Sequence, residues 1–146
     1  MTSRPAEVCH TEDGSASVEF IGLSVILLIP AIYLLITISQ LQSAGYAAVA
    51  ASDQAAKTIG YSADDAVAET RALETVHLTA QNYAVDPTET SMTIECSNPE
   101  CTIPGTRITV HVSIDVPLPL IPTFLGESTR IATMNATGHH LIGEFE

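Results

Sequence analysis

The residue best placed to do chemistry in this sequence is a single carboxylate, Glu19, at the edge of a long apolar run. No charged residue follows it until Asp53, so 33 consecutive positions are uncharged. A bare carboxylate among apolar helices is costly unless a positive partner compensates it. Glu19 is therefore either a solvated residue at a lipid–water boundary or the partner of a cation, such as a free α-amino group of its own or a neighbouring chain.

Two cysteines form the second pattern of chemical interest. Cys96 and Cys101 flank the sequence Ser-Asn-Pro-Glu, in which Asn-Pro marks a turn. A closed hairpin at this turn brings the two α-carbons within disulfide reach. Metal binding by the pair is the rival interpretation, although no second Cys or His pair stands at zinc spacing.

The histidines give a weaker signal. His139 and His140 are adjacent and could hold a metal ion together with Glu144 or Glu146, although such a pair near a chain end is more often a solvated tail. No Ser-His-acid arrangement and no Gly-rich phosphate loop stands out in the sequence. We therefore expect no enzyme activity, no cofactor or bound metal, and no small-molecule substrate.

The overall charge argues against another class of partner. The 146 residues include 5 Lys or Arg and 17 Asp or Glu, a net charge of −12. Such a chain repels phosphate backbones, so nucleic-acid binding is not expected.

The first element that must position Glu19 is the apolar run itself. Residues 20–38 rise roughly 28 Å as an α-helix, close to the hydrocarbon thickness of a bilayer. Pro30 lies within this run and is expected to bend the helix. The apolar core is longer than that of a cleavable signal peptide, so we expect a single span over residues 15–39 in a lipid bilayer.

The orientation of the span follows from the few positive charges. Arg4 and the free amine are the only ones before the apolar run, which favours a cytoplasmic N-terminus and an extracytoplasmic C-terminus. The cysteines agree with this orientation. If a leader containing Cys9 is removed, the odd count of three cysteines becomes a pair in an oxidising compartment.

A helical region is expected over residues 40–86. The membrane helix continues through Ala-rich sequence to about Ile59, and Gly60 suits its C-terminus. Ser62 and Asp65 resemble a capping box that opens a second helix, which ends at Asp86-Pro87. We expect that helix to be apolar on one face, formed by Ala66, Leu73, Val76, Ala80 and Tyr83.

Small residues repeat along the first helix beyond the span, and two interpretations of them stay open. They either form a seam between neighbouring helices in a filament or simply reflect high helix propensity. The six are Ala44, Ala47, Ala48, Ala51, Ala55 and Ala56.

Beyond residue 87 the period of the apolar residues changes from helical to two, which predicts a small β-rich region over residues 87–146. Strands are expected around 91–96, over 108–116 and over 129–137, with a proline-punctuated apolar loop at 116–126. The expected fold class is therefore α+β: a long N-terminal membrane-spanning helix that continues into an Ala-rich helix, a second helix, and a small antiparallel sheet of about three strands.

The sequence G-S-A-S-V-E-F over residues 14–20 resembles the processing site of type IV prepilins. Together with the apolar helix that contains a proline, the Ala-rich helix and the strand region, it resembles the TadE-like family, pilin-like proteins of tight-adherence (Flp-type) pilus systems. The resemblance implies that residues 1–14 are a leader, removed after Gly14 by a prepilin peptidase, with Ser15 the first mature residue. It also implies that Glu19 and Phe20 set the registration of subunits.

By this resemblance the chain is a minor pilin or pseudopilin in the inner membrane, assembled into or at the base of a cell-surface pilus used in adhesion or secretion. Its partners would be the bilayer, the prepilin peptidase, other pilin-like subunits and the assembly machinery. The alternative is a single-pass anchored binding module that is neither processed nor assembled. A secreted metal-dependent enzyme is a remote third hypothesis. The leader is acidic where prepilin leaders are usually basic, and a mature Ser15 does not imply N-methylation.

Overall fold

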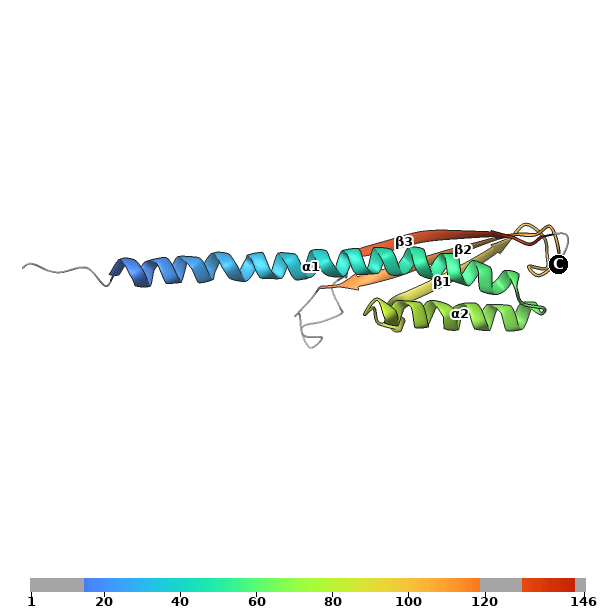
Figure 1. The fold of residues 1–146 in the computed structure, drawn as a ribbon, viewed down its shortest axis with the longest axis horizontal. Coiled ribbons are helices and arrows are strands. Elements are labelled where there is room, and N and C mark those ends of the chain that lie inside the picture. Colours follow the sequence, from blue (N-terminus) through green and yellow to red (C-terminus); the bar gives the residue numbers. More distant parts are fainter. Residues whose placement is uncertain (1–14, 119–129, 144–146) are drawn as a thin grey trace, which may run out of the picture. The chain divides into compact units, whose positions relative to one another are not determined.

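The computed structural model describes residues 15–118 and 130–143 (Figure 1). Its elements, in chain order, are α1 (Ser15–Gly60), α2 (Asp65–Asn82), the 3₁₀ helix η1 (Pro87–Glu89), β1 (Thr90–Cys96), β2 (Arg107–Pro117) and β3 (Arg130–Leu141). One long helix, a second helix and a three-stranded antiparallel sheet confirm the expected α+β class. The described residues divide into two units, the first ending at Leu35 and the second beginning at Ile36, and α1 contributes to both.

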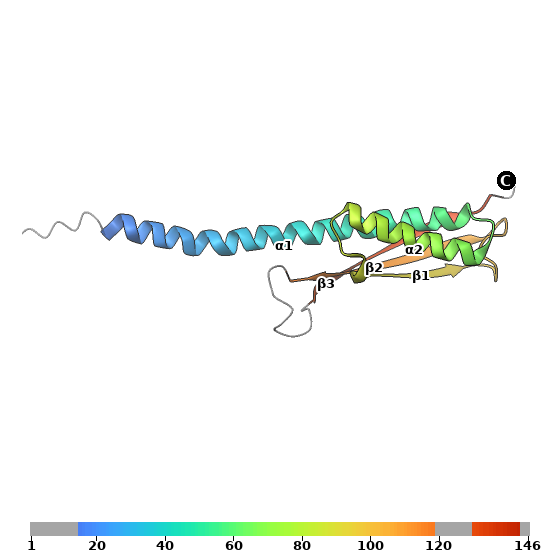
Figure 2. The same cartoon turned by 90° about the horizontal axis from the view of Figure 1, so that it is seen from below.

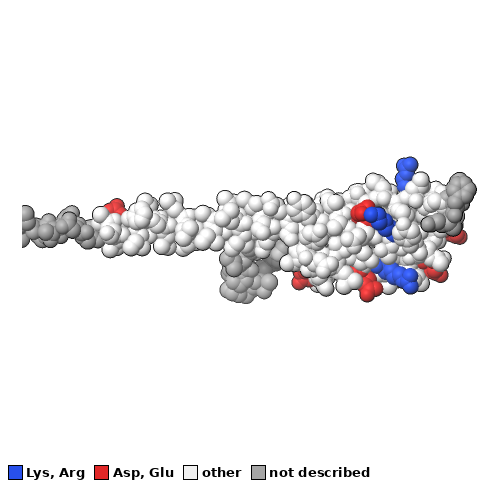
Figure 3. All heavy atoms as spheres, in the orientation of Figure 1, with Lys and Arg blue, Asp and Glu red and all other residues white. Residues whose placement is uncertain are grey.

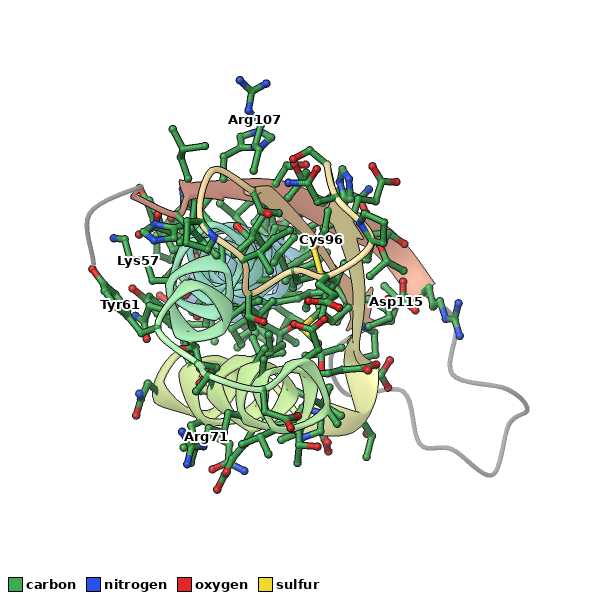
Figure 4. The ribbon with its side chains drawn as sticks, turned by 90° about the vertical axis from the view of Figure 1, so that its right-hand side faces the viewer. Lys57, Tyr61, Arg71, Cys96, Arg107 and Asp115 are labelled. Carbon is green, nitrogen blue, oxygen red and sulfur yellow. A yellow bond between two sulfur atoms is a disulfide. The ribbon has the colours of Figure 1, made fainter. Side chains whose placement is uncertain are left out.

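The second unit has two layers. Its sheet has the order β1-β2-β3, and both α2 and the C-terminal part of α1 lie on one face of it (Figures 2 and 4). The central strand β2 alternates as predicted, with one side chain in two pointing into the core and the others carrying hydroxyl, imidazole or carboxylate groups. The buried side chains of β2 are Ile108, Val110, Val112, Ile114 and Val116.

The alanines of α1 belong to this core. All six are at most 2 % exposed, and they cluster with the apolar side chains of β2 and α2. A filament seam between chains therefore has to use other residues, because this face of α1 is already covered within the chain. High helix propensity alone also does not explain the alanines, because their small side chains let the helix lie very close to the sheet.

The closest approach is between α1 and β3. A Cβ atom added to Gly138 would collide with the main-chain carbonyl of Ser52, so only glycine fits at this position of the strand. Ser52 is 1 % exposed, and its hydroxyl donates to the carbonyl of Val49 at 3.0 Å. The backbone of α1 thus packs directly on the backbone of β3.

The start of α2 differs from the prediction. Asp64 caps the helix, and its carboxylate accepts from the amides of Ala66 and Val67 at 2.9 and 3.3 Å. Ser62 instead closes the end of α1, where its hydroxyl donates to the carbonyl of Thr58 at 2.8 Å. The predicted capping box at Ser62 and Asp65 was therefore wrong, because two acceptors compete locally and the one nearer the helix makes the cap.

The face of α2 that is buried also differs from the predicted one. Of the predicted apolar positions Val76 and Ala80 are buried, whereas Leu73 is 41 % and Tyr83 36 % exposed, and Ala66 is exposed. The helix ends at Asn82, earlier than predicted, and Asp86 caps η1 through the amide of Thr88. The residues that α2 buries are Ala68, Ala72, Val76, Thr79 and Ala80.

The third strand extends beyond its predicted end at Thr137 to Leu141, because its last residues pair with the beginning of β2, where Arg107 faces Leu141. Gly138 lies in this extension and marks the close approach to α1. Most of the predicted proline-punctuated loop, residues 119–126, lies outside the described residues, as does the predicted start of the third strand at Thr129.

Replacement of Gly138 by alanine should lower the free energy of unfolding by about 1–3 kcal/mol, because either α1 or β3 must move to relieve the overlap. Gly45→Ala is the matched control: nothing lies within 4 Å of its added Cβ, and alanine favours the helix, so stability should be unchanged or slightly higher. Thermal unfolding of the detergent-solubilised protein, followed by circular dichroism, measures both. Equal stability of the two variants would contradict the close packing of α1 on β3.

Candidate functional site

The candidate site at the start of α1 is described from Ser15 onward. Gly14 lies outside the described residues, and so does the Gly14–Ser15 peptide bond at which cleavage is expected. The helix begins at Ser15, which places Glu19 four residues along and just beyond the first turn. Positions four apart share one face of a helix, so the backbone of Ser15 and the side chain of Glu19 lie on the same side.

This placement of Glu19 changes its electrostatics. Stabilisation of a carboxylate by the helix dipole falls off beyond the first turn. The dipole alone is therefore a weak partner for Glu19, and a discrete positive group would be a stronger one. Phe20 follows with 70 % of its surface exposed.

The apolar part of α1 is uncovered within the described chain. From Val18 to Ile38 its large apolar side chains are 39–72 % exposed, and on the face shown in Figure 3 this stretch is almost free of charge apart from one acidic side chain near its start. An 18-residue window of the helix has a mean hydropathy of 2.6, and none of it is buried. A core helix of a soluble protein would be mostly buried, so this stretch provides a membrane anchor or a signal segment.

The expected disulfide is present between Cys96 and Cys101, with α-carbons 5.4 Å apart (Figure 4). The structure therefore favours the disulfide over metal binding by these two sulfurs. The amide of Cys101 donates to the carboxylate of Asp65 at 3.1 Å, which fixes the hairpin to the first turn of α2. Because disulfides persist in oxidising compartments, this bond indicates an extracytoplasmic second unit.

The two adjacent histidines do not converge on one point. Successive residues of a strand point to opposite faces of the sheet. His139 faces outward, where its Nδ1 lies 3.2 Å from the hydroxyl of Thr109, while His140 faces inward and packs on Gly60 and Tyr61. A metal site that uses both imidazoles is therefore incompatible with the strand, and the other suggested ligands, Glu144 and Glu146, lie outside the described residues.

A groove of about 370 Å³ opens at the end of the second unit where α1 enters. The sequence analysis missed it, because its walls come from three distant segments: the start of this part of α1, the connection after α2, and the end of β2. The only local signal was the acidic connection itself, with Asp86 and Glu89. The residues that line the groove include Ser39, Ser43, Val85, Asp86, Glu89, Ile114, Asp115 and Val116.

No protein-family model, curated protein or solved structure matches this chain. The architecture is nevertheless pilin-like: a long N-terminal apolar helix whose C-terminal part packs against a small antiparallel sheet.

Loss of the disulfide should destabilise the second unit modestly. The closed loop is short, so replacement of both Cys96 and Cys101 by serine should cost about 2 kcal/mol of unfolding free energy. Denaturant unfolding of the variant and the parent protein measures the difference. An unchanged midpoint would show that hydrogen bonds within the hairpin and to Asp65 hold it without the disulfide.

Proposed function

We propose that this protein is a pilin-like structural subunit of the TadE-like kind. It is inserted in the inner membrane, cleaved after Gly14 by a prepilin peptidase, and assembled as a minor pilin or pseudopilin into or at the base of a tight-adherence pilus. The observation that carries the proposal is the uncovered apolar stretch of α1 with one carboxylate, Glu19, at its start. Such a surface suits first a bilayer and then the packed helices of a filament.

The proposed cleavage gives Glu19 its partner. A new α-amino group on Ser15 stands on the same side of the helix as Glu19, four residues along. The same amine on a neighbouring subunit is the alternative partner when helices stack. Either pairing removes the cost of a bare carboxylate between apolar helices.

The remaining features fit a subunit whose activity is assembly rather than catalysis. The disulfide suits a second unit exposed outside the cytoplasm. The partners in this proposal are the bilayer, the prepilin peptidase, other pilin-like subunits and the assembly machinery, without nucleic acid or a small-molecule substrate.

An anchored binding module is the second candidate, favoured by the groove at the end of the second unit. Such a module would keep its N-terminal residues and would act without pilus machinery. The two candidates therefore differ in the N-terminus of the working protein.

The first prediction from the proposal concerns that N-terminus. Mass spectrometry of membrane and filament fractions should find a mature chain that begins at Ser15, and Gly14→Ile should block the cleavage while the protein still inserts. Thiol labelling gives an independent check, because loss of the leader removes Cys9 and leaves only the disulfide-bonded pair. Intact Met1 in assembled material would support the anchored binding module instead.

The second prediction concerns the carboxylate. Glu19→Ala and the neutral, similarly sized Glu19→Gln should insert normally but enter filaments at least about tenfold less, because both variants lose the charge. Glu19→Gln keeps the size of the side chain and so isolates the effect of the charge. Glu74→Ala, which removes an exposed carboxylate on α2, is the matched control and should assemble normally. Sheared filaments are quantified against the membrane pool. Normal assembly of Glu19→Gln would show that the charge is dispensable.

A further inference from the structure

The two ends of the second unit differ in which charged side chains have no partner in the described residues. We call the end at which α1 enters the base, where Ser39 and Ser43 line the groove, and the opposite end the tip, where α1 finishes at Gly60 beside His140. The end of β2 lies at the base and its beginning at the tip, because Val116 lines the groove while Arg107 pairs with Leu141.

The base is acidic. Asp86, Glu89 and Asp115 all line the groove. Asp86 accepts hydrogen bonds from the amide and hydroxyl of Thr88 at 2.9 and 2.7 Å, and the bond from the amide is the main cause of a pKa below its usual value. Asp115 is paired with Arg130 at 3.0 Å. Three carboxylates thus face one cation, which leaves the groove negative.

Glu89 is the carboxylate most available to an external partner. Its backbone amide donates to the carbonyl of Asp86 at 3.1 Å, which fixes its place in η1. Within residues 15–118 and 130–143 its carboxylate has no hydrogen-bond or ion-pair partner. Apolar walls formed by Val85, Ile114 and Val116 lie in the same groove.

The tip carries an available cation. Arg107 begins β2, and its side chain points away from the body of the unit (Figure 4). No partner for its guanidinium exists in the described part of the chain, whereas Lys57 is held by Asp53 at 2.7 Å. Leu141, directly opposite Arg107 in the strand register, is 62 % exposed. The tip therefore presents an unpaired guanidinium beside an apolar side chain, at an end that also holds the carboxylates of Asp64, Asp65 and Glu100.

We propose that the groove at the base of one copy receives Arg107 and Leu141 from the tip of another copy, so that the units stack head to tail. A guanidinium suits the free carboxylate of Glu89, and a leucine suits the apolar walls. The inference rests on the proposed function and names the partner of the groove as a second copy of this chain.

Charge and symmetry favour a second copy over an unrelated partner. The net charge is −12 for the full sequence and −10 without residues 1–14, which hold one Arg and three acidic residues. Such copies repel one another in general, so association needs a local arrangement that places a cation against carboxylates. Two copies that are anchored in the same direction can bring the tip of one to the base of the other only when one copy is displaced along the length of its second unit. A contact between two different surfaces repeats from copy to copy and builds a filament when the rotation between copies does not close a ring.

The experiment exchanges the two charges in the full-length protein, in cells that assemble it. Arg107→Glu and Glu89→Arg should each lower the sheared-filament fraction at least about tenfold, because each places like charges in contact. The double variant restores the opposite charges and should recover the wild-type level within about threefold. Arg71→Glu and Glu74→Arg make the same charge changes on the exposed surface of α2 and should assemble normally.

Each outcome decides the proposal. Failure of the double variant to recover would overturn the pairing of Glu89 with Arg107. Loss of assembly with Glu89→Arg but not with Arg107→Glu would show that another basic protein occupies the groove. Circular dichroism and an intact Cys96–Cys101 bond establish that each variant is folded.

The N-terminus of every variant distinguishes a failure of the head-to-tail contact from a failure of the proposed function. If the chains begin at Ser15 but the charge exchange fails, only the head-to-tail contact is wrong. If the wild-type chain keeps its leader and no filament forms, the proposed function is wrong and the head-to-tail contact with it.

Discussion

The constraint on which the structure depends is the amount of apolar surface on α1 that this small chain can cover. Where the sheet and α2 are available, the helix carries alanines, and all six are buried. Before Ser39 the helix carries leucine, isoleucine, valine and phenylalanine side chains that stay exposed. The cost of exposing such side chains to water is removed only by an environment outside the described chain, a bilayer or other apolar helices.

The change in side-chain size along α1 decides which surfaces remain for other molecules. The alanines of the helix and Gly138 of the strand let the two backbones touch. This face of the helix is therefore covered within the chain. The opposite face keeps Tyr46 and Val49, which are 68 % and 61 % exposed. In this part of α1 these exposed positions remain available to other molecules, whereas the alanine face does not.

Features fixed by neighbouring residues could be predicted from the sequence. The period-two pattern of β2, the disulfide across a four-residue turn and the helix end at Gly60 all depend on local spacing. The prediction of which residue caps α2 was wrong, because Ser62 and Asp64 offer competing acceptors only two residues apart.

Features that depend on long-range contacts could not be predicted. The last four residues of β3 are strand because β2 lies beside them, and the predicted strand ended before them at Thr137. The alanine face allowed several interpretations until the sheet was in place. The groove was invisible because its carboxylates, such as Glu89 and Asp115, are far apart in the sequence.

α1 buries its alanine face within the chain and leaves its apolar stretch to other molecules. Cysteine cross-linking between copies in native membranes compares the two surfaces, with Leu35→Cys and Ala48→Cys as the pair, 67 % and 1 % exposed. Cross-linked dimers should form through position 35 and not through position 48. Efficient cross-linking through position 48 would show that the alanine face lies between chains and is not buried within one.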